Sequence, residues 1–460
     1  EKDYLSEFSD QGEALDKLET GTDLAVLKTG DESVYRYDQM GTHSYENSSM
    51  QTGTNGTSYY FSVASGDITN FFNEVDLNTP WDYHYENLDS RTILDRLAAV
   101  KYFVVKAGEE EYLPYGYDTL AAEVEKNDKL YRAYECKNAL PIGYTYDSYI
   151  PEEKYAKMST VEKQQALLQG VILSNSTVPE TTSEFNDREV PYKLVTGSGC
   201  REKDGKLIVT KENAQAKLVF DGLDECETYL ITEGVDYEAL SPRELISDKK
   251  WSKMTLYEQK KIQYENSTWR YWKESQKAYI DVTGQFLDKT ISIFTDKYNA
   301  YSGRSDFLCN TGYSVKRKKS ITLTFENTGV YSYKNMKVVC QPIENIESQT
   351  TKLGAESLEN VEIKNHELTG NISVSKDKVL VISLPYSKGF QAYVDGQKTE
   401  LKQANTMYMA LELKKGAHEI RLTYCTPYLK AGLILTCAGV LCYICVVLAY
   451  KKKRGKKKHG

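Results

Sequence analysis

A single long apolar segment near the C-terminus limits what this chain can fold into. Residues 431–450, AGLILTCAGVLCYICVVLAY, contain no charged side chain, and the basic sequence KKKRGKKKHG follows them directly. Twenty residues of α-helix at about 1.5 Å per residue span roughly 30 Å, the thickness of the hydrocarbon core of a bilayer. Lys and Arg residues that flank such a span stay in the cytoplasm. The sequence therefore predicts a transmembrane helix over 428–450, a basic cytoplasmic tail over 451–460 and an extracytoplasmic region over 1–427.

The predicted extracytoplasmic region is acidic. The chain holds 58 Lys and Arg and 66 Asp and Glu, and eight of the basic residues but none of the acidic ones lie from Lys430 onward. Residues 1–427 therefore carry a formal net charge of −16. A surface this acidic repels the phosphates of nucleic acids, so we expect no nucleic-acid partner. The partner that the apolar segment predicts is the lipid bilayer.

Apolar periodicity predicts an α+β, mostly β fold. Before about residue 190 the signals are mixed, with the apolar spacing of a helix over 90–100 and an expected strand over 25–27. After that point apolar side chains recur at every second position, which is the period of a strand with one buried face. We therefore expect a mixed α/β extracytoplasmic domain over 1–190 and a jelly-roll-like β-sandwich over 191–427.

Turn signals divide the predicted sandwich into strands. Asp204-Gly205 and Asp395-Gly396 are dipeptides typical of tight hairpins. Residues 407–424 alternate between apolar and polar side chains, with Lys415-Gly416 between the two halves. This pattern predicts a further hairpin that buries one face.

Capping signals predict where two helices begin. Ser159 and Glu162 have the spacing of a capping box, in which each residue bonds the backbone of the other. Ser241-Pro242-Arg243-Glu244 combines the same spacing with proline at the first helical position. The second signal opens a charged, aromatic segment over about 241–279, which we expect to be a helical insert in the sandwich.

The motifs of common enzyme and metal sites do not occur in the sequence. The five histidines, at positions 43, 84, 366, 418 and 459, have no metal-ligand spacing, and no Walker loop, dinucleotide fingerprint or nucleophile elbow is present. We therefore expect no metal, no cofactor and no catalytic residue in this chain. Spacing alone is compatible with two distant carboxylates of a glycoside hydrolase.

Tyrosine is unusually frequent, with 37 Tyr against 12 Phe and 4 Trp. Flat aromatic rings stack on the C–H faces of sugars, while neighbouring carboxylates and amides bind the hydroxyls. Two aromatic clusters supply the candidate carbohydrate contacts, which are Trp81, Tyr83, Tyr85, Trp269, Tyr271 and Trp272. The alternative is that these rings are amphipathic residues of the core and of interfaces.

One segment resembles a known family. Residues 131–173 include Glu135, a short spacer and then NALPIGY over 138–144, and this signature resembles the outer region of the bacterial YfhO membrane-protein family. Residues 97–103, 384–401 and 414–432 are similar to three further elements of that family, although two alanines replace Leu-Gly in LAAVKYF. The residues that match the family motif are Glu135, Asn138, Leu140, Pro141, Gly143 and Tyr144.

The resemblance implies a function and a location. The family is similar to polytopic glycosyltransferases that use undecaprenyl-phosphate sugars outside the membrane and carry the catalytic acid in an N-terminal bundle of helices. It implies that this chain is the extracytoplasmic C-terminal part and last helix of such an enzyme in a bacterial plasma membrane. Its partners would be the N-terminal bundle, a lipid-linked sugar and a teichoic-acid-like surface polymer. Because the chain begins at Glu1 with no signal peptide, we expect it to be either a processed chain or, as we favour, part of a longer protein.

Two alternatives stay open. The chain can equally be a membrane-anchored carbohydrate-binding or adhesive surface module without transferase activity. The family motif has a packing interpretation as well, because Leu140-Pro141 favours extended backbone and Gly143 favours a tight turn. On that interpretation the motif forms a corner of the fold rather than a site.

Overall fold

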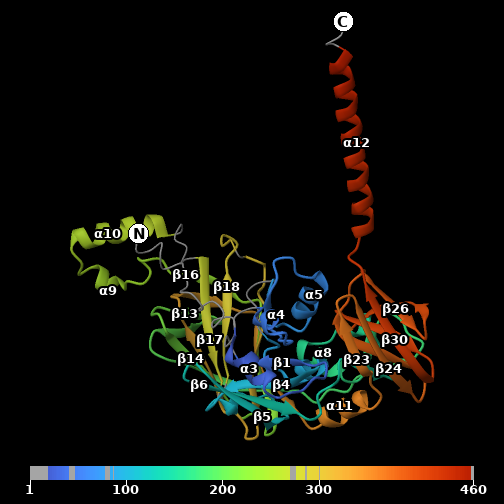
Figure 1. Ribbon diagram of the computed structural model, residues 1–460. Helices are drawn as coiled ribbons and strands as arrows, with labels where there is room; N and C mark the ends of the chain where they lie inside the picture. The colour runs from blue at the N-terminus through green and yellow to red at the C-terminus, as the bar shows by residue number, and fades with distance from the viewer. Residues whose placement is uncertain are drawn as a thin grey trace.

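The computed structural model describes residues 19–40, 47–77, 83–85, 87–269, 276–284, 287–299 and 301–456. The described part is mostly β, with several sheets, short helices and one long C-terminal helix that projects from the rest of the molecule (Figure 1). The fold class predicted from the sequence is thus confirmed.

The N-terminal part is built on a four-stranded sheet of order β1-β4-β6-β5. β1 runs parallel to β4, and the other pairs are antiparallel. Short helices surround the sheet, and α6 lies within the segment 90–100 for which a helix is predicted. The elements are α3 (Gly21–Leu27), β1 (Arg36–Gln39), α4 (Ser48–Thr52), β2 (Tyr59–Tyr60), α5 (Gly66–Glu74), β3 (His84–Tyr85), α6 (Thr92–Leu97), β4 (Val100–Lys106), η1 (Glu110–Tyr112), β5 (Tyr117–Lys126) and β6 (Lys129–Cys136).

One strand prediction in this part is wrong. Residues 25–27 lie in helix α3, because the side chain of Thr20 accepts a hydrogen bond from the backbone N–H of Asp23 and caps the helix. The apolar residues of this short helix pack on the sheet, with Ala25 and Val26 almost fully buried.

A connecting region joins the first sheet to the central β part. β8 (Tyr149–Pro151) runs parallel to β9 (Val171–Leu173), with α7 (Glu152–Tyr155) and α8 (Thr160–Ala166) between them. The predicted capping box of α8 is present, since Ser159 and Glu162 each bond the backbone of the other residue.

The central part contains three sheets that enclose one hydrophobic core. Their orders are β10-β22-β15-β19, β11-β14-β20-β17-β18 and β12-β13-β21-β16. Strict alternation of buried and exposed side chains along β14 shows the predicted period of two. The strands are β10 (Arg188–Val190), β11 (Tyr192–Thr196), β12 (Cys200–Lys203), β13 (Lys206–Val209), β14 (Ala214–Phe220), β15 (Cys226–Glu233), β16 (Asp236–Ala239), β17 (Lys277–Thr283), β18 (Asp288–Phe294), β19 (Phe307–Ser314), β20 (Ser320–Phe325), β21 (Gly329–Ser332) and β22 (Asn335–Pro342).

Two helices lie between β16 and β17, namely α9 (Asp248–Trp251) and α10 (Leu256–Thr268). Neither begins at Ser241, where the capping signal was found. Ser241 instead bonds the carboxylate of Glu244 through its own N–H and hydroxyl within a turn. The capping box that does start a helix joins Thr255 to Glu258 at the N-terminus of α10. A hydroxyl residue followed three positions later by Glu therefore forms a turn at Ser241 and begins a helix at Thr255.

The C-terminal part is a second sandwich, with sheets of order β23-β24-β30-β26-β27 and β28-β29-β25-β7. Asp395-Gly396 forms the predicted tight turn between β26 and β27. α11 precedes β23 in the chain. The elements are β7 (Gly143–Tyr146), α11 (Ile346–Gly354), β23 (Glu359–Lys364), β24 (Glu367–Val374), β25 (Lys378–Pro385), β26 (Phe390–Val394), β27 (Gln397–Thr399), β28 (Lys402–Ala404), β29 (Tyr408–Leu413) and β30 (Gly416–Tyr424).

The hairpin predicted over 407–424 does not form. β29 pairs with β25 and β28, whereas β30 pairs with β24 and β26 in the opposite sheet. The alternating apolar side chains of both strands still point into the shared core between the two sheets. The chain therefore crosses the sandwich at Gly416 instead of turning back along its own strand.

The long helix α12 (Leu429–Lys456) begins four residues after β30 ends. Its segment Leu429–Lys451 is long and apolar enough to cross a membrane, which fits a lipid bilayer as a partner. The domain limits at 190/191, 427/428 and 450/451 stay predictions. Backbone pairing crosses the first of them, because β10 pairs with β22 and β7 pairs with β25.

Candidate functional site

The two family-like segments at 97–103 and 135–144 meet in the first sheet. β4 pairs with β6 so that Tyr102 lies opposite Glu135. Lys101, next to Tyr102, forms an ion pair with Asp31 and lies 3.6 Å from the carboxylate of Glu135. Burial by itself would raise the pKa of Asp31, but hydrogen bonds from Lys101, Ser33 and Tyr102 outweigh it and lower this pKa to about 2. Asp31 is therefore an anion that holds Lys101 in place.

Asn138 links the motif to α11. Its side-chain amide donates to Glu347, whose other carboxylate oxygen lies 2.5 Å from the guanidinium of Arg96. Arg96 is fully buried and also donates to the hydroxyl of Thr350 at 3.1 Å. Burial would raise the pKa of Glu347, yet the hydrogen bond from Arg96 keeps that pKa below its usual range. The exposed Asn138 thus completes a polar bridge between α6 and α11.

The remaining motif residues pack the fold. Leu140 and Tyr144 are buried, and the hydroxyl of Tyr144 donates to the carbonyl of Leu97 at 3.1 Å. A Cβ atom on Gly143 would lie 2.7 Å from the Cβ of Leu358, so glycine lets the two segments approach closely. Pro141 is half-buried. These contacts favour the packing interpretation for the apolar half of the motif.

Two hollows flank the loop that carries Asn138. One has a volume of about 870 Å³ and is lined by Arg96, Tyr115, Asn138 and Glu347 among others. The other, of about 440 Å³, is lined by residues that include Tyr35, Lys101, Leu140 and Pro141. Cys136 and Lys137 line both hollows. The family motif therefore forms a ridge with a recess on either side.

A pair of variants separates packing from surface contact in this motif. Gly143→Ala is expected to lower the free energy of unfolding by about 1–3 kcal/mol, because the added methyl group meets Leu358. Asn138→Ala is expected to cost about 1 kcal/mol or less, because the hydrogen bond that it removes is exposed. Urea denaturation of both variants and of the parent chain in detergent measures the difference. Equal losses would contradict this division of roles.

The two described tyrosines of the first aromatic cluster, Tyr83 and Tyr85, differ in exposure. Tyr85 is 1% exposed and packs against Tyr59 and Phe72 with ring centroids 4.7 Å apart in each case, which leaves no ring face for a sugar. Tyr83 is exposed, and Trp81 lies outside the described residues. Tyr85 is therefore a core residue, in line with the alternative considered from the sequence.

Trp269 of the second cluster lines a large open hollow of about 1410 Å³ at the end of α10. Tyr271 and Trp272 lie outside the described residues. Tyr301 lines the same hollow and is half exposed. Acids, bases and amides complete the lining, which includes Asp236, Glu238, Arg243, Glu244, Asn266, Asp296, Lys297, Arg304 and Lys334.

This lining has the chemistry of a site for a hydroxyl-rich ligand. Half-buried Trp269 supplies an aromatic side chain to the lining, while the carboxylates and amides supply acceptors and donors for hydroxyl groups. Basic side chains in the same wall suit phosphate groups. Among the described residues, no group of three or more His, Cys, Asp and Glu side chains could hold a metal ion. We therefore take the hollow at Trp269, which we call the α10 hollow, as the candidate site.

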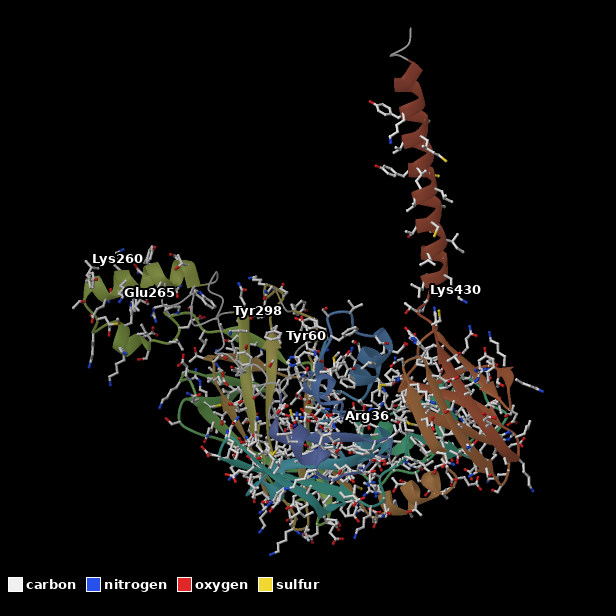
Figure 2. The ribbon with its side chains drawn as sticks, in the orientation of Figure 1. Arg36, Tyr60, Lys260, Glu265, Tyr298 and Lys430 are labelled. Atoms are coloured by element: carbon white, nitrogen blue, oxygen red, sulfur yellow. The ribbon has the colours of Figure 1, made fainter. Side chains whose placement is uncertain are left out.

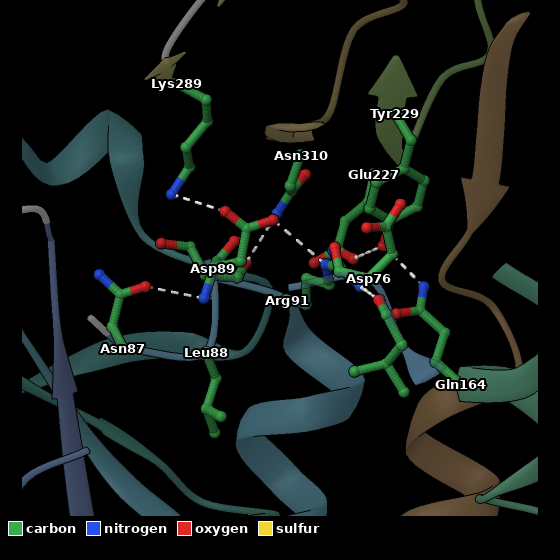
Figure 3. Close-up of polar contacts among 12 residues, drawn as sticks. Asp76, Asn87, Leu88, Asp89, Arg91, Gln164, Glu227, Tyr229, Lys289 and Asn310 are labelled. Carbon is green, nitrogen blue, oxygen red and sulfur yellow. Dashed lines mark hydrogen bonds and ion pairs between the residues drawn. The ribbon is translucent and has the colours of Figure 1, made fainter. Parts of the chain in front are cut away.

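Arg304 in the wall of the α10 hollow contacts a buried polar cluster, whose residues Asp76, Asp89, Arg91 and Lys289 are drawn in Figure 3. Arg304 lines the hollow and pairs with Asp76 at 2.6 Å. Arg91 donates to the carbonyl of Asp76 at 2.9 Å and pairs with Asp89, which also pairs with Lys289 at 2.8 Å. The cluster therefore joins the loops next to α5 and α6 to the central part of the molecule. No local sequence signal identified it, because its members come from four separate segments.

Comparisons with known proteins agree with the resemblance seen in the sequence. Residues 2–436 match the model of a family described as bacterial membrane protein YfhO. A protein of Bacillus subtilis (strain 168), described as "Uncharacterized protein YfhO", is 22% identical over 458 residues, which are 99% of this chain and 47% of that protein. The chain thus spans about half the length of this relative.

The match to a solved structure is far weaker than the match to the family model. The arabinofuranosyltransferase AftD from Mycobacteria matches with 13% identity and a TM-score of 0.14, over 32% of this chain and 12% of that chain. A likeness of this size carries no argument about fold or function. The family model, in contrast, covers nearly the whole sequence. The chain belongs to the YfhO family of bacterial membrane proteins.

Proposed function

We propose that this chain is the extracytoplasmic part of a bacterial membrane glycosyltransferase. The enzyme transfers a sugar from undecaprenyl phosphate to a teichoic-acid-like polymer of the cell surface. Residues 1–427 lie outside the plasma membrane, α12 spans it and the basic tail over 451–460 is cytoplasmic. Family membership and the apolar helix support this proposal. In this proposal the catalytic bundle is a separate N-terminal part of a longer protein, and the chain spans 47% of its longer Bacillus subtilis relative.

In this scheme the chain orients the acceptor and supplies no catalytic residue. A carboxylate of the membrane bundle accepts the proton of an acceptor hydroxyl, the hydroxyl oxygen bonds the anomeric carbon, and the phosphate of the lipid carrier leaves with the electron pair of the broken bond. The α10 hollow would hold the polymer so that one hydroxyl reaches this centre. Holding two reactants in position supplies a large part of such a rate enhancement.

The α10 hollow is the observation that carries the proposal. It combines the ring of Trp269 with acidic and basic side chains, and a polymer of sugars, polyols and phosphates presents partners for all three. Figure 2 shows α10 and Tyr298 on the side of the molecule toward which α12 projects, across the molecule from Lys430. An acceptor in this hollow would therefore lie on the side of the region that faces the lipid-linked sugar.

Replacing Trp269 by alanine tests the acceptor role. The variant is expected to raise KM for the acceptor polymer about tenfold and to leave kcat nearly unchanged, because it removes a stacking surface but no reacting group. The measurement is sugar transfer to added polymer in membrane vesicles from cells that make the protein. Tyr257→Ala is the matched control, since Tyr257 is an exposed aromatic residue of the same insert that does not line the hollow.

Two outcomes would count against the proposal. An unchanged KM for the acceptor polymer in Trp269→Ala would show that the acceptor does not bind in the α10 hollow. Transfer from a lipid-linked sugar by the 460-residue chain alone would contradict the assignment of catalysis to the membrane bundle.

The second candidate function is a membrane-anchored carbohydrate-binding or adhesive module. The open shape and mixed lining of the α10 hollow favour it as much as they favour an acceptor site. Glycan-array binding by the chain in detergent, together with normal surface glycosylation in cells that lack the protein, would support this candidate. Loss of glycosylation in those cells would favour the transferase.

A further inference from the structure

Four large apolar side chains are exposed together around α4 and β2. Met50, Tyr60, Phe61 and Val63 are 83%, 45%, 59% and 77% exposed. We call these four residues the interfacial patch. Soluble domains rarely expose several large apolar side chains on one short segment unless a partner or a membrane covers them.

The segment that carries the interfacial patch has no charge. Residues 47–66 contain no Asp, Glu, Lys or Arg, although charged residues make up 27% of the chain. The other side chains of this segment are small or hydroxyl- and amide-bearing groups. Moving a charge out of water is costly, whereas Tyr, Ser and Asn tolerate the boundary between water and lipid. The composition of 47–66 thus suits contact with lipid headgroups.

Hydrogen bonds hold the interfacial patch in place. The side-chain amide of Asn47 donates to the carbonyl of Tyr60 at 2.8 Å and accepts from the N–H of Tyr60 at 3.1 Å. The N–H of Phe61 donates to the carbonyl of Tyr83 at 2.9 Å, and the rings of Tyr60 and Tyr83 meet edge to face. The apolar side chains are therefore presented outward from an ordered backbone.

The interfacial patch lies at the end of the molecule from which the membrane helix leaves. α5 follows the patch and packs on the C-terminal sandwich, with the rings of Phe71 and Tyr408 6.1 Å apart and a hydrogen bond from Thr406 to Glu74. α12 leaves the same sandwich four residues after β30. Figure 1 shows the α4–α5 segment just below the level where α12 begins, and Figure 2 places Tyr60 on that side of the molecule.

We propose that the interfacial patch inserts into the headgroup region of the bilayer that α12 crosses. The region then contacts the membrane at two places, through a spanning helix and through a shallow aromatic and aliphatic wedge. Two contacts fix the tilt of the region on the membrane, which one helix alone does not. This proposal rests on α12 spanning the bilayer and is independent of the glycosyltransferase proposal.

Photo-crosslinking in intact membranes tests the proposal. The photoreactive amino acid p-benzoylphenylalanine is incorporated at position 61 of the protein, which is expressed in the bacterium that naturally makes it. Membranes from these cells are irradiated, and mass spectrometry then identifies the molecules that have become crosslinked to position 61. Position 63 serves as a second site if position 61 does not tolerate the probe. Position 120 is the control, because Leu120 is 48% exposed on β5, at the end of the molecule away from α12.

We expect phospholipid adducts at position 61 or 63 about tenfold more often than at position 120, as insertion to the depth of an interfacial helix implies. Adducts with another protein segment, including a membrane bundle of the same protein, would show that protein covers the patch and would overturn the proposal. Equal lipid yields at positions 61, 63 and 120 would overturn it as well.

Discussion

Replacing Glu227 by alanine is expected to lower the free energy of unfolding by about 3–5 kcal/mol, more than any other single change considered for this chain. Glu227 lies on β15 and is fully buried. Its carboxylate accepts hydrogen bonds from the N–H and the hydroxyl of Thr92, at 2.9 and 2.6 Å, and from the hydroxyl of Tyr229 at 2.5 Å. Alanine leaves these three buried donors without an acceptor.

The position of Glu227 at the N-terminus of α6 adds to this loss. The N–H of Thr92 belongs to the first turn of α6, where the helix dipole favours a negative charge. Arg91, one residue earlier, is also fully buried. Removal of Glu227 therefore removes a negative charge close to the buried Arg91. This site lies at the contact between α6 of the N-terminal part and β15 of the central part.

Urea denaturation of the chain in detergent measures the effect of Glu227→Ala. Glu227→Gln should lose less stability, because the amide oxygen still accepts hydrogen bonds. Glu202→Ala, at an exposed position on β12, is the matched surface control and should change little. If Glu227→Ala were as stable as Glu202→Ala, the buried hydrogen bonds of Glu227 would not stabilise the fold, and the prediction would be wrong.

Asp95→Asn is expected to stabilise the chain relative to the parent by an amount that grows as pH rises above about 4. Asp95 lies on α6, fully buried, and burial together with the negative charges of Asp38 and Glu227 raises its pKa well above the ordinary value. Asp95 shares a hydrogen bond with Asp38, and within the described residues neither oxygen of Asp95 accepts a hydrogen bond from another group. The Asp38 carboxylate, in contrast, accepts from the hydroxyl of Thr57 at 2.6 Å and the N–H of Leu88 at 3.0 Å. The proton therefore resides on Asp95.

The sign of this pH dependence follows from proton binding in the two states. The unfolded chain loses the Asp95 proton near pH 4, whereas the folded chain retains it to higher pH. The stability of the parent is therefore fully present below about pH 4 and falls by about 1.4 kcal/mol per pH unit until the raised pKa is passed. Asparagine has no proton to lose and removes this contribution.

The slope of the stability difference against pH is the quantity to measure for Asp95→Asn. Thermal unfolding of parent and variant between pH 4 and 8 provides it, and a constant offset from altered packing does not affect the slope. Asp288→Asn, at an exposed position on β18, is the control. Parallel curves of stability against pH for the parent and Asp95→Asn would show that Asp95 is ionised in the folded chain and would contradict the prediction.

The alternation of apolar residues identified buried faces but not strand partners. Met409 and Leu411 on β29, and Ile420 and Leu422 on β30, were expected on one buried face and do lie in one core. A hairpin and a crossing between two facing sheets bury the same alternate residues, so the pattern does not separate them. Only backbone pairing with β24, β25, β26 and β28 shows that the chain crosses the sandwich.

The candidate site was predictable only in part for a related reason. Trp269 stood out because aromatic residues cluster next to it in the sequence, but Tyr301 and Lys334 reach the α10 hollow from distant strands and loops without any local signal. The same holds for Asp95, which has the sequence context of an exposed helix residue. Its burial comes from the packing of α6 between parts of the molecule far apart in the sequence.

The four residues between β30 and α12 have a further consequence. Even fully extended, four residues reach only about 14 Å. A region on so short a tether cannot diffuse away from its helix, so it travels in the plane of the membrane and meets other membrane-borne molecules by a search in two dimensions. Its effective concentration at the bilayer surface is set by this tether and not by the amount of protein in the cell.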